Sequence, residues 1–117
     1  MSQQSVVYKY LIPFQEGFEL TLPKGSQIVR IDNDQGNPYL WALVPLNEPD
    51  TVTYKFQSSK TGGIMTHEKP LYFIGTISIF VQMQLMLYVF IEDVIDSENN
   101  SVLSEYVSSV NSCWKGK

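Results

Sequence analysis

The sequence has too few cysteine and histidine residues for a structural metal site or an internal disulfide. Its 117 residues include one cysteine, Cys113, and one histidine, His67. A lone cysteine has no partner for a bridge within the chain, and a structural zinc site needs four ligands that are mostly Cys or His. We therefore expect neither a metal nor another cofactor. The single cysteine and the lack of an N-terminal leader pattern predict a cytoplasmic protein.

The sequence also lacks a basic surplus. It carries eight Lys and Arg residues against twelve Asp and Glu residues, which gives a formal net charge of −4. Much of the acidity lies from Glu92 onward, so the preceding part of the chain is close to neutral. Proteins that bind duplex nucleic acid normally carry a clear positive surplus, because they neutralise phosphates. We therefore exclude duplex nucleic acid as a partner, whereas a small anionic ligand would need only two or three well-placed cations.

Formal charge is absent from one long stretch, residues 71–91. Its length would suffice for a membrane helix. However, Gln82 and Gln84 lie inside it, and amide groups are costly within a bilayer. Apolar side chains recur there at a period of two, and β-branched and aromatic types are frequent, which is typical of strands. We predict a soluble β-hairpin that turns near residues 80–84, with no membrane contact.

Strand patterns recur through the first 96 residues, separated by turn residues such as Pro, Gly, Asn and Asp. The other predicted strands span residues 6–12, 18–22, 27–31, 39–44 and 51–56. Residues 39–44 are uniformly apolar, which predicts a central strand covered on both faces, with Trp41 in the core. The predicted fold is mainly β: a compact antiparallel β-sandwich or barrel of six to seven strands, with residues 1–96 as the β-domain.

After residue 96 the apolar period changes to three and four residues, which predicts one C-terminal amphipathic helix over about residues 101–114. Residues 97–117 comprise this helix and the tail. The apolar side chains of the helix must be buried against the sheet or against a second subunit, and we predict a homo-oligomer that uses them. The predicted oligomer-interface residues are Val102, Leu103, Tyr106, Val107, Val110 and Trp114.

The most suggestive polar cluster is Lys60 followed by Thr61, Gly62 and Gly63. Two glycines let backbone N–H groups approach an anion, and the lysine adds positive charge, as in phosphate-binding nests. The alternative is a β-connection in which the glycines supply positive φ. His67 would be the general base in a third hypothesis, hydrolysis of a phosphodiester. No residue near it in sequence offers a nucleophile, so an exposed loop histidine is the simpler interpretation.

The order of the motifs resembles a family of small, mostly phage and prophage proteins described as a domain of unknown function. The matching residues include Leu22-Pro23-Lys24-Gly25, Gly36-Asn37-Pro38, Leu40-Trp41-Ala42-Leu43-Val44, Thr61-Gly62-Gly63, Phe73-Ile74-Gly75-Thr76 and Tyr88-Val89-Phe90-Ile91-Glu92. The resemblance covers most of residues 6–92, and its most specific part is the block that contains Trp41. It implies no catalytic residues, and the predicted C-terminal helix has no counterpart in it.

A small phage-type protein without catalytic motifs is expected to be a binder rather than an enzyme, and such proteins often counter host defence. We expect a non-catalytic counter-defence protein, acting in the infected bacterial host, that sequesters a small anionic nucleotide signal. The expected ligand-binding residues are Arg30, Lys55, Lys60 and the backbone of Thr61, Gly62 and Gly63, with Tyr54 or Tyr39 stacked on the base. The alternative is a protein–protein adaptor or inhibitor of a host protein that acts through the C-terminal helix and acidic tail.

Overall fold

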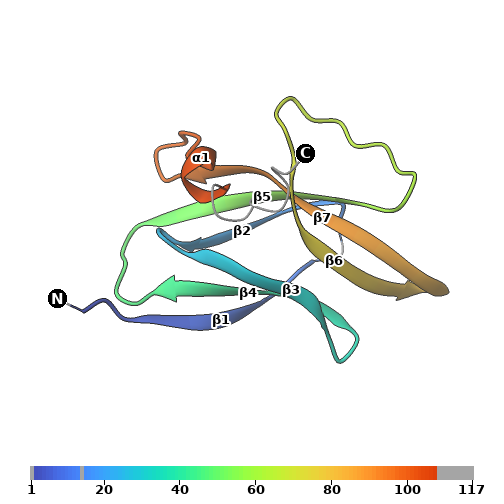
Figure 1. Cartoon of the computed structure of the whole chain (residues 1–117), viewed down its shortest axis with the longest axis horizontal. Helices are drawn as coiled ribbons and strands as arrows, with labels where there is room; N and C mark the ends of the chain where they lie inside the picture. Colours follow the sequence, from blue (N-terminus) through green and yellow to red (C-terminus); the bar gives the residue numbers. More distant parts are fainter. Residues whose placement is uncertain (1, 14, 108–117) are drawn as a thin grey trace.

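The structure is a computed structural model that describes residues 2–13 and 15–107. These residues form seven strands and one short helix (Figure 1). The elements are β1 (Ser5–Leu11), β2 (Gly17–Pro23), β3 (Gln27–Asp34), β4 (Asn37–Pro45), β5 (Thr51–Ser59), β6 (Tyr72–Val81), β7 (Met83–Asp96) and α1 (Leu103–Val107). The mainly β class and each predicted strand are thereby confirmed.

The strands form two antiparallel sheets that pack face to face. One sheet has the order β1-β4-β3 and the other the order β2-β5-β7-β6. The uncharged stretch is the β6–β7 hairpin, as predicted, and its turn lies at Gln82, which has a φ of 71°. No helix in the described part of the chain is long and apolar enough to cross a membrane.

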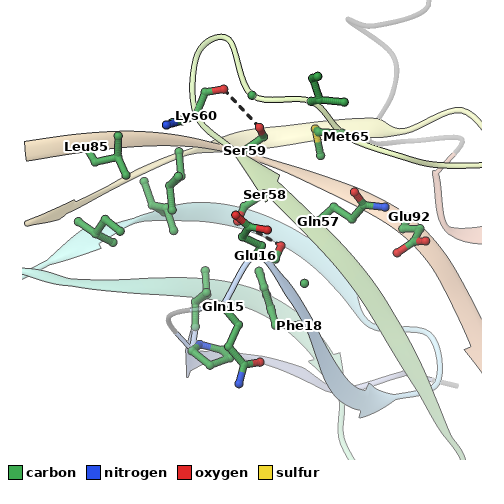
Figure 2. A pocket seen from close by; sticks show the side chains of 18 of the residues that line it. Gln15, Glu16, Phe18, Gln57, Ser58, Ser59, Lys60, Met65, Leu85 and Glu92 are labelled. Carbon is green, nitrogen blue, oxygen red and sulfur yellow. Dashed lines mark hydrogen bonds between the residues drawn. The ribbon is translucent and has the colours of Figure 1, made fainter. Parts of the chain in front are cut away.

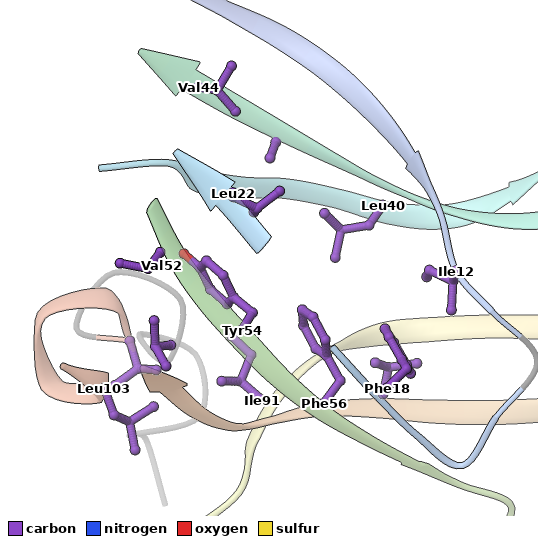
Figure 3. Close-up of a cluster of buried hydrophobic side chains, with 14 of the residues drawn as sticks. Ile12, Phe18, Leu22, Leu40, Val44, Val52, Tyr54, Phe56, Ile91 and Leu103 are labelled. Carbon is purple, nitrogen blue, oxygen red and sulfur yellow. The ribbon is translucent and has the colours of Figure 1, made fainter. Parts of the chain in front are cut away.

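The two sheets bury their facing side chains in one core between them (Figure 3). Alternation decides which residues point inward, since successive side chains of a strand face opposite sides. The buried hydrophobic residues are Ile12, Phe18, Leu22, Leu40, Ala42, Val44, Val52, Tyr54, Phe56, Ile77, Val89, Ile91, Val94, Leu103 and Val107. Phe18 and Phe56 stack at the centre of this core, with ring centroids 4.7 Å apart.

The central strand β4 departs from its prediction. Leu40, Ala42 and Val44 are buried, but the alternate residues Tyr39 and Trp41 are only half-buried. The three-stranded sheet is an outer layer, and no element of the described structure packs on its outer side (Figure 1). The prediction that β4 is covered on both faces, with Trp41 in the core, is therefore wrong.

The sheets approach each other along β3 and β6. The side-chain amide of Asn33 donates to the carbonyl oxygen of Ser78, and its oxygen accepts from the Ser78 N–H at 2.6 Å. Gly75 lies against Ile31, so close that an added Cβ would be 2.0 Å from the Ile31 Cγ2 atom. No ladder joins β3 to β6 or β1 to β2, so the structure is an open sandwich and not a closed barrel.

The helix α1 packs onto the core of its own chain. Leu103 and Val107 are buried, and the Tyr106 ring lies edge-on to Tyr54 with centroids 5.6 Å apart. The Tyr106 hydroxyl oxygen accepts a hydrogen bond from the Gly25 N–H at 2.9 Å. The helix thus covers the sheet, which is one of its two predicted roles.

An intersubunit role for the helix stays a prediction. Val102 is half-buried against the same core, so the described apolar residues of the helix already have partners within the chain. Val110 and Trp114, the other two predicted interface residues, lie outside the described residues.

Candidate functional site

The structure does not gather the predicted ligand-binding residues into one site. Arg30 and Tyr39 lie on the outer face of the three-stranded sheet, whereas Lys55 lies on β5 in the other sheet. Lys60, Thr61, Gly62 and Gly63 lie in the connection between β5 and β6.

Tyr54 is inaccessible to a ligand base. Its side chain is 1% exposed, and its hydroxyl donates to the carbonyl oxygen of Ser26 at 3.2 Å. Burial raises the pKa of Tyr54 far above its ordinary value. The side chain faces inward because Val52, Tyr54 and Phe56 occupy alternate positions of β5, which sends Lys55 to the opposite face. The predicted stacking role does not fit Tyr54, and Tyr39 is the remaining candidate.

The glycine cluster forms a tight turn at the end of β5. The Gly63 N–H donates to the Lys60 carbonyl oxygen at 3.0 Å, and Gly62 has a φ of 86°. The Thr61 hydroxyl lies 3.3 Å from the hydroxyl of Tyr88 on β7. Because the Gly63 N–H is already used inside the turn, this geometry favours the alternative in which the glycines supply positive φ over an anion nest.

His67 lies in the same connection, and its Nδ1 atom is 2.6 Å from the Lys69 carbonyl oxygen. The Lys69 ammonium in turn forms an ion pair of 2.9 Å with Asp93, whose carboxylate also accepts from the Ser101 hydroxyl at 2.7 Å. These contacts hold the β5–β6 connection against β7. Within the described ranges, no group of three His, Cys, Asp or Glu side chains is placed to hold a metal ion.

The outer face of the three-stranded sheet carries a cluster of rings and cations. We call Lys9, Arg30, Tyr39 and Trp41 the aromatic face. The Lys9 ammonium lies 4.1 Å from the Tyr39 ring centroid and 5.7 Å from that of Trp41. The Arg30 guanidinium carbon lies 4.4 Å from the Trp41 ring centroid. The two rings are 6.1 Å apart and tilted by 53°.

Strand register explains why these residues meet. Trp41 on β4 pairs with Lys9 on β1 and with Arg30 on β3, so the three form one row across the sheet. The β3–β4 ladder shifts by one residue between Ile28 and Arg30, which leaves Val29 as a bulge. A one-residue shift moves every following side chain of the strand to the opposite face of the sheet. Without this bulge, Arg30 would point into the core.

Both cations of the aromatic face are paired with carboxylates. Lys9 forms an ion pair of 2.6 Å with Asp34, and Arg30 one of 3.0 Å with Asp32. The hydrogen bond from Arg30 lowers the pKa of Asp32, and the bond from the Asn33 N–H lowers it further. Asp32 is therefore ionised at neutral pH, and each cation of the aromatic face has a carboxylate group beside it.

Exposed aliphatic side chains border the aromatic face. Val7 and Leu11, on the same side of β1 as Lys9, are 50% and 57% exposed. Sequence reasoning missed Lys9 and misplaced Trp41 in the core. The sequence shows that Val7, Lys9 and Leu11 alternate and so share one face of β1. It does not show which residues of β4 pair with them.

A cavity of about 1020 Å³ lies elsewhere, where β2 begins and β5 ends (Figure 2). Its apolar wall comes from Ile12, Phe18, Ile64, Met65 and the inner side of the β6–β7 hairpin, namely Ile77, Ile79, Leu85 and Leu87. Its polar lining includes Glu16, Gln57, Lys60 and Glu92. One cation against two carboxylates makes this cavity a poor site for an anionic nucleotide.

Comparison with known families gives one result. A family model described as a domain of unknown function, DUF7352, matches residues 3–99. No curated protein and no solved structure matches the chain. The expected membership of a family of unknown function is thus confirmed, and the association with phages stays a prediction.

Proposed function

Starting from the fact that the chain belongs to the DUF7352 family, whose function is unknown, we propose that it is a non-catalytic protein that binds another protein through the aromatic face. In the phage setting that the sequence resemblance implies, the partner is a host defence protein in the bacterial cytoplasm. The proposal keeps the adaptor hypothesis and moves its binding surface from the helix to the three-stranded sheet.

One observation carries this proposal: Trp41 and Tyr39 are half-buried on an open sheet face, with Arg30 and Lys9 laid over their rings. Trp, Tyr and Arg are the residue types that most often dominate the binding energy of protein interfaces. Rings held between strands lose little conformational freedom on binding, so that most of the gained contact energy contributes to affinity. Val7 and Leu11 extend the apolar contact at one edge.

The charge pattern favours a protein partner over a nucleotide. Asp32 and Asp34 already hold the two cations, so an anionic ligand would have to displace a carboxylate from each. Small ligands are usually enclosed in concave sites. Neither the large cavity described above nor the smaller one between Lys24 and Tyr106 is lined by a residue of the aromatic face.

The test is capture of a partner by the full chain on a solid support from a lysate of bacterial host cells. Trp41→Ser and Arg30→Glu should abolish capture of a protein that the wild type enriches. Ile64→Ser is the matched control, because Ile64 is 95% exposed and lies in the β5–β6 connection. Equal capture by all four proteins, or no enriched protein at all, contradicts the proposal.

Sequestration of a nucleotide signal is the second candidate function. The aromatic face also favours this function, because the predicted ligand-binding residues Arg30 and Tyr39 lie there beside Trp41 and Lys9. A thermal-shift screen with cyclic dinucleotides, cyclic trinucleotides and ADP-ribose tests it, since a ligand at a hundred times its Kd stabilises by about 2.7 kcal/mol. A shift that Arg30→Glu removes, with the ligand recovered intact, supports sequestration. A shift with an altered ligand supports the phosphodiesterase hypothesis instead.

A further inference from the structure

The β6–β7 hairpin exposes more apolar surface than the fold requires. Phe80 and Met83, on either side of the turn, are 77% and 69% exposed, and Met86 is 43% exposed. The stretch that contains them has no formal charge. Alternation from the buried Ile77 and Val89 places Phe80 and Met86 on the outer face of the hairpin and Met83 on its inner face. Exposed hairpin ends normally carry polar or charged residues, so an apolar end of this kind is a candidate interaction site.

Toward its end, the inner side of the hairpin is also left uncovered by the elements that the structure describes. Ile77 is 3% exposed, Ile79 and Leu85 are half-buried, and Met83 is largely exposed. The hairpin extends past the β3–β4 turn of the opposite sheet, so none of the seven described strands faces its end (Figure 1). A sheet face with an apolar stripe is stable when another layer buries it.

The uncovered stripe is continuous with the large cavity, because Ile79 and Leu85 belong to both. Figure 2 shows Leu85 on one side of this cavity and Lys60 and Ser59 above it. Gln15, Glu16 and Lys60 on the border are exposed, so the cavity opens to solvent. A volume of about 1020 Å³ matches that of sites that enclose a drug-sized ligand, which is ample for two large side chains.

We propose that this region is the interface of a symmetric homodimer, in which the hairpin end of each copy packs into the cavity of the other. A two-fold interface uses the same patch on both copies, so the patch must complement itself. Here the projecting apolar end and the apolar cavity lie next to each other on one hairpin, so each copy offers both halves of such a patch. A standard interface buries about 800 Å² on each partner, roughly a tenth of the 7613 Å² surface of this chain.

Charge and packing argue against other occupants. An interfacial membrane contact needs cations beside the apolar residues, but residues 71–91 contain none and the chain has a net charge of −4. The other route to self-association, through the helix, is less suitable because Leu103 and Val107 are already buried in their own core. The dimer does not involve the aromatic face, which remains open on both copies.

The first test is the molar mass of the full chain in solution, measured by light scattering over a concentration series. The wild type should be a dimer, and Met83→Glu and Phe80→Glu should weaken the dimer by about a hundredfold, as expected for central interface residues. Both side chains are exposed, so neither substitution should destabilise the fold of the monomer itself. Leu46→Glu is the control, because Leu46 is 41% exposed and follows β4, in the opposite sheet. A monomeric wild type, or equal masses for Met83→Glu and Leu46→Glu, overturns the proposal.

The second test identifies the contact. Met83→Cys and Gln15→Cys are prepared separately with Cys113→Ser, then mixed and oxidised. A disulfide-linked dimer should form in the mixture with a higher yield than with either protein alone, because the hairpin end of one copy faces the cavity border of the other. A yield no higher than that of the separate proteins overturns the reciprocal arrangement.

Discussion

The guanidinium carbon of Arg30 lies 4.4 Å from the centre of the Trp41 ring, directly across the β3–β4 ladder. The same guanidinium forms an ion pair of 3.0 Å with Asp32. Arg30 is therefore held over the ring by a carboxylate on its own strand. This arrangement keeps a large aromatic ring stable on an open sheet face and presents the ring and the cation together.

Removal of the Arg30 side chain should have a small effect on stability. We expect Arg30→Ala to lower the free energy of unfolding by about 0.5–1 kcal/mol, the usual range for an exposed cation–π contact. Urea unfolding followed by tryptophan fluorescence measures it. Lys55→Ala, a cation on the other sheet, is the control and should be nearly neutral. A loss well above about 2 kcal/mol would mean that Arg30 supports the fold rather than a surface.

Gly75 should be intolerant of any side chain. Its added Cβ would be 2.0 Å from the Ile31 Cγ2 atom, so Gly75→Ala must push β6 away from β3 and should cost about 2–3 kcal/mol. Gly17→Ala is the control, because its Cβ would lie an ordinary 3.8 Å from the Phe56 carbonyl oxygen. Combined with Ile31→Ala, Gly75→Ala should cost less than it does alone. Additive losses in this double-mutant cycle contradict the contact.

Asn33 should hold the edge of β6 in place. Its amide forms two hydrogen bonds with the backbone of Ser78, and both groups lose their partner in Asn33→Ala. We expect a loss of about 1–3 kcal/mol and faster hydrogen exchange at the Ser78 amide. Gln27→Ala, on the same strand, should leave this exchange rate unchanged. If exchange at Ser78 is equally slow in Asn33→Ala, the amide does not protect the edge.

Stability should depend on pH through Asp93. Partial burial alone would raise the pKa of Asp93, but hydrogen bonds from Lys69, Ser101 and the Val94 N–H outweigh it, and the net shift is downward. A carboxylate whose pKa is lower in the folded state adds stability above its unfolded pKa of about 3.9. This contribution is lost as the pH falls through the folded pKa.

The measurement is the free energy of unfolding of the wild type and of Asp93→Asn as the pH is lowered from about 6 to below the unfolded pKa. The wild type should be more stable at the higher pH, and its advantage should shrink below about pH 4. An advantage that does not change with pH would show that the ionised carboxylate contributes nothing through these bonds.

The fold was largely predictable because its strands follow the two-residue period. The turn at Gln82 was placed to within a few residues, although it has no glycine. The failures occurred where the sequence does not say what lies opposite. Trp41 belongs to an apolar run, but the described residues cover β4 on one side only, and this depends on the arrangement of both sheets.

The candidate site was harder to predict because it depends on register. Arg30 reaches the outer face only because Val29 forms a bulge, and neither residue type requires one at that position. Lys9 joins Trp41 through the β1–β4 pairing, which spans more than thirty positions of sequence. Tyr54 suits stacking by residue type alone, but its alternation with Lys55 places the two side chains on opposite faces of β5.

The affinity of the purified chain for its captured partner, measured by calorimetric titration, tests directly whether the aromatic face binds that partner. Trp41→Ala should raise Kd by about thirtyfold or more, which corresponds to a loss of at least about 2 kcal/mol for a central interface ring. Ile64→Ala should change Kd by less than about threefold. If Trp41→Ala binds as tightly as the wild type, the aromatic face is not the binding surface.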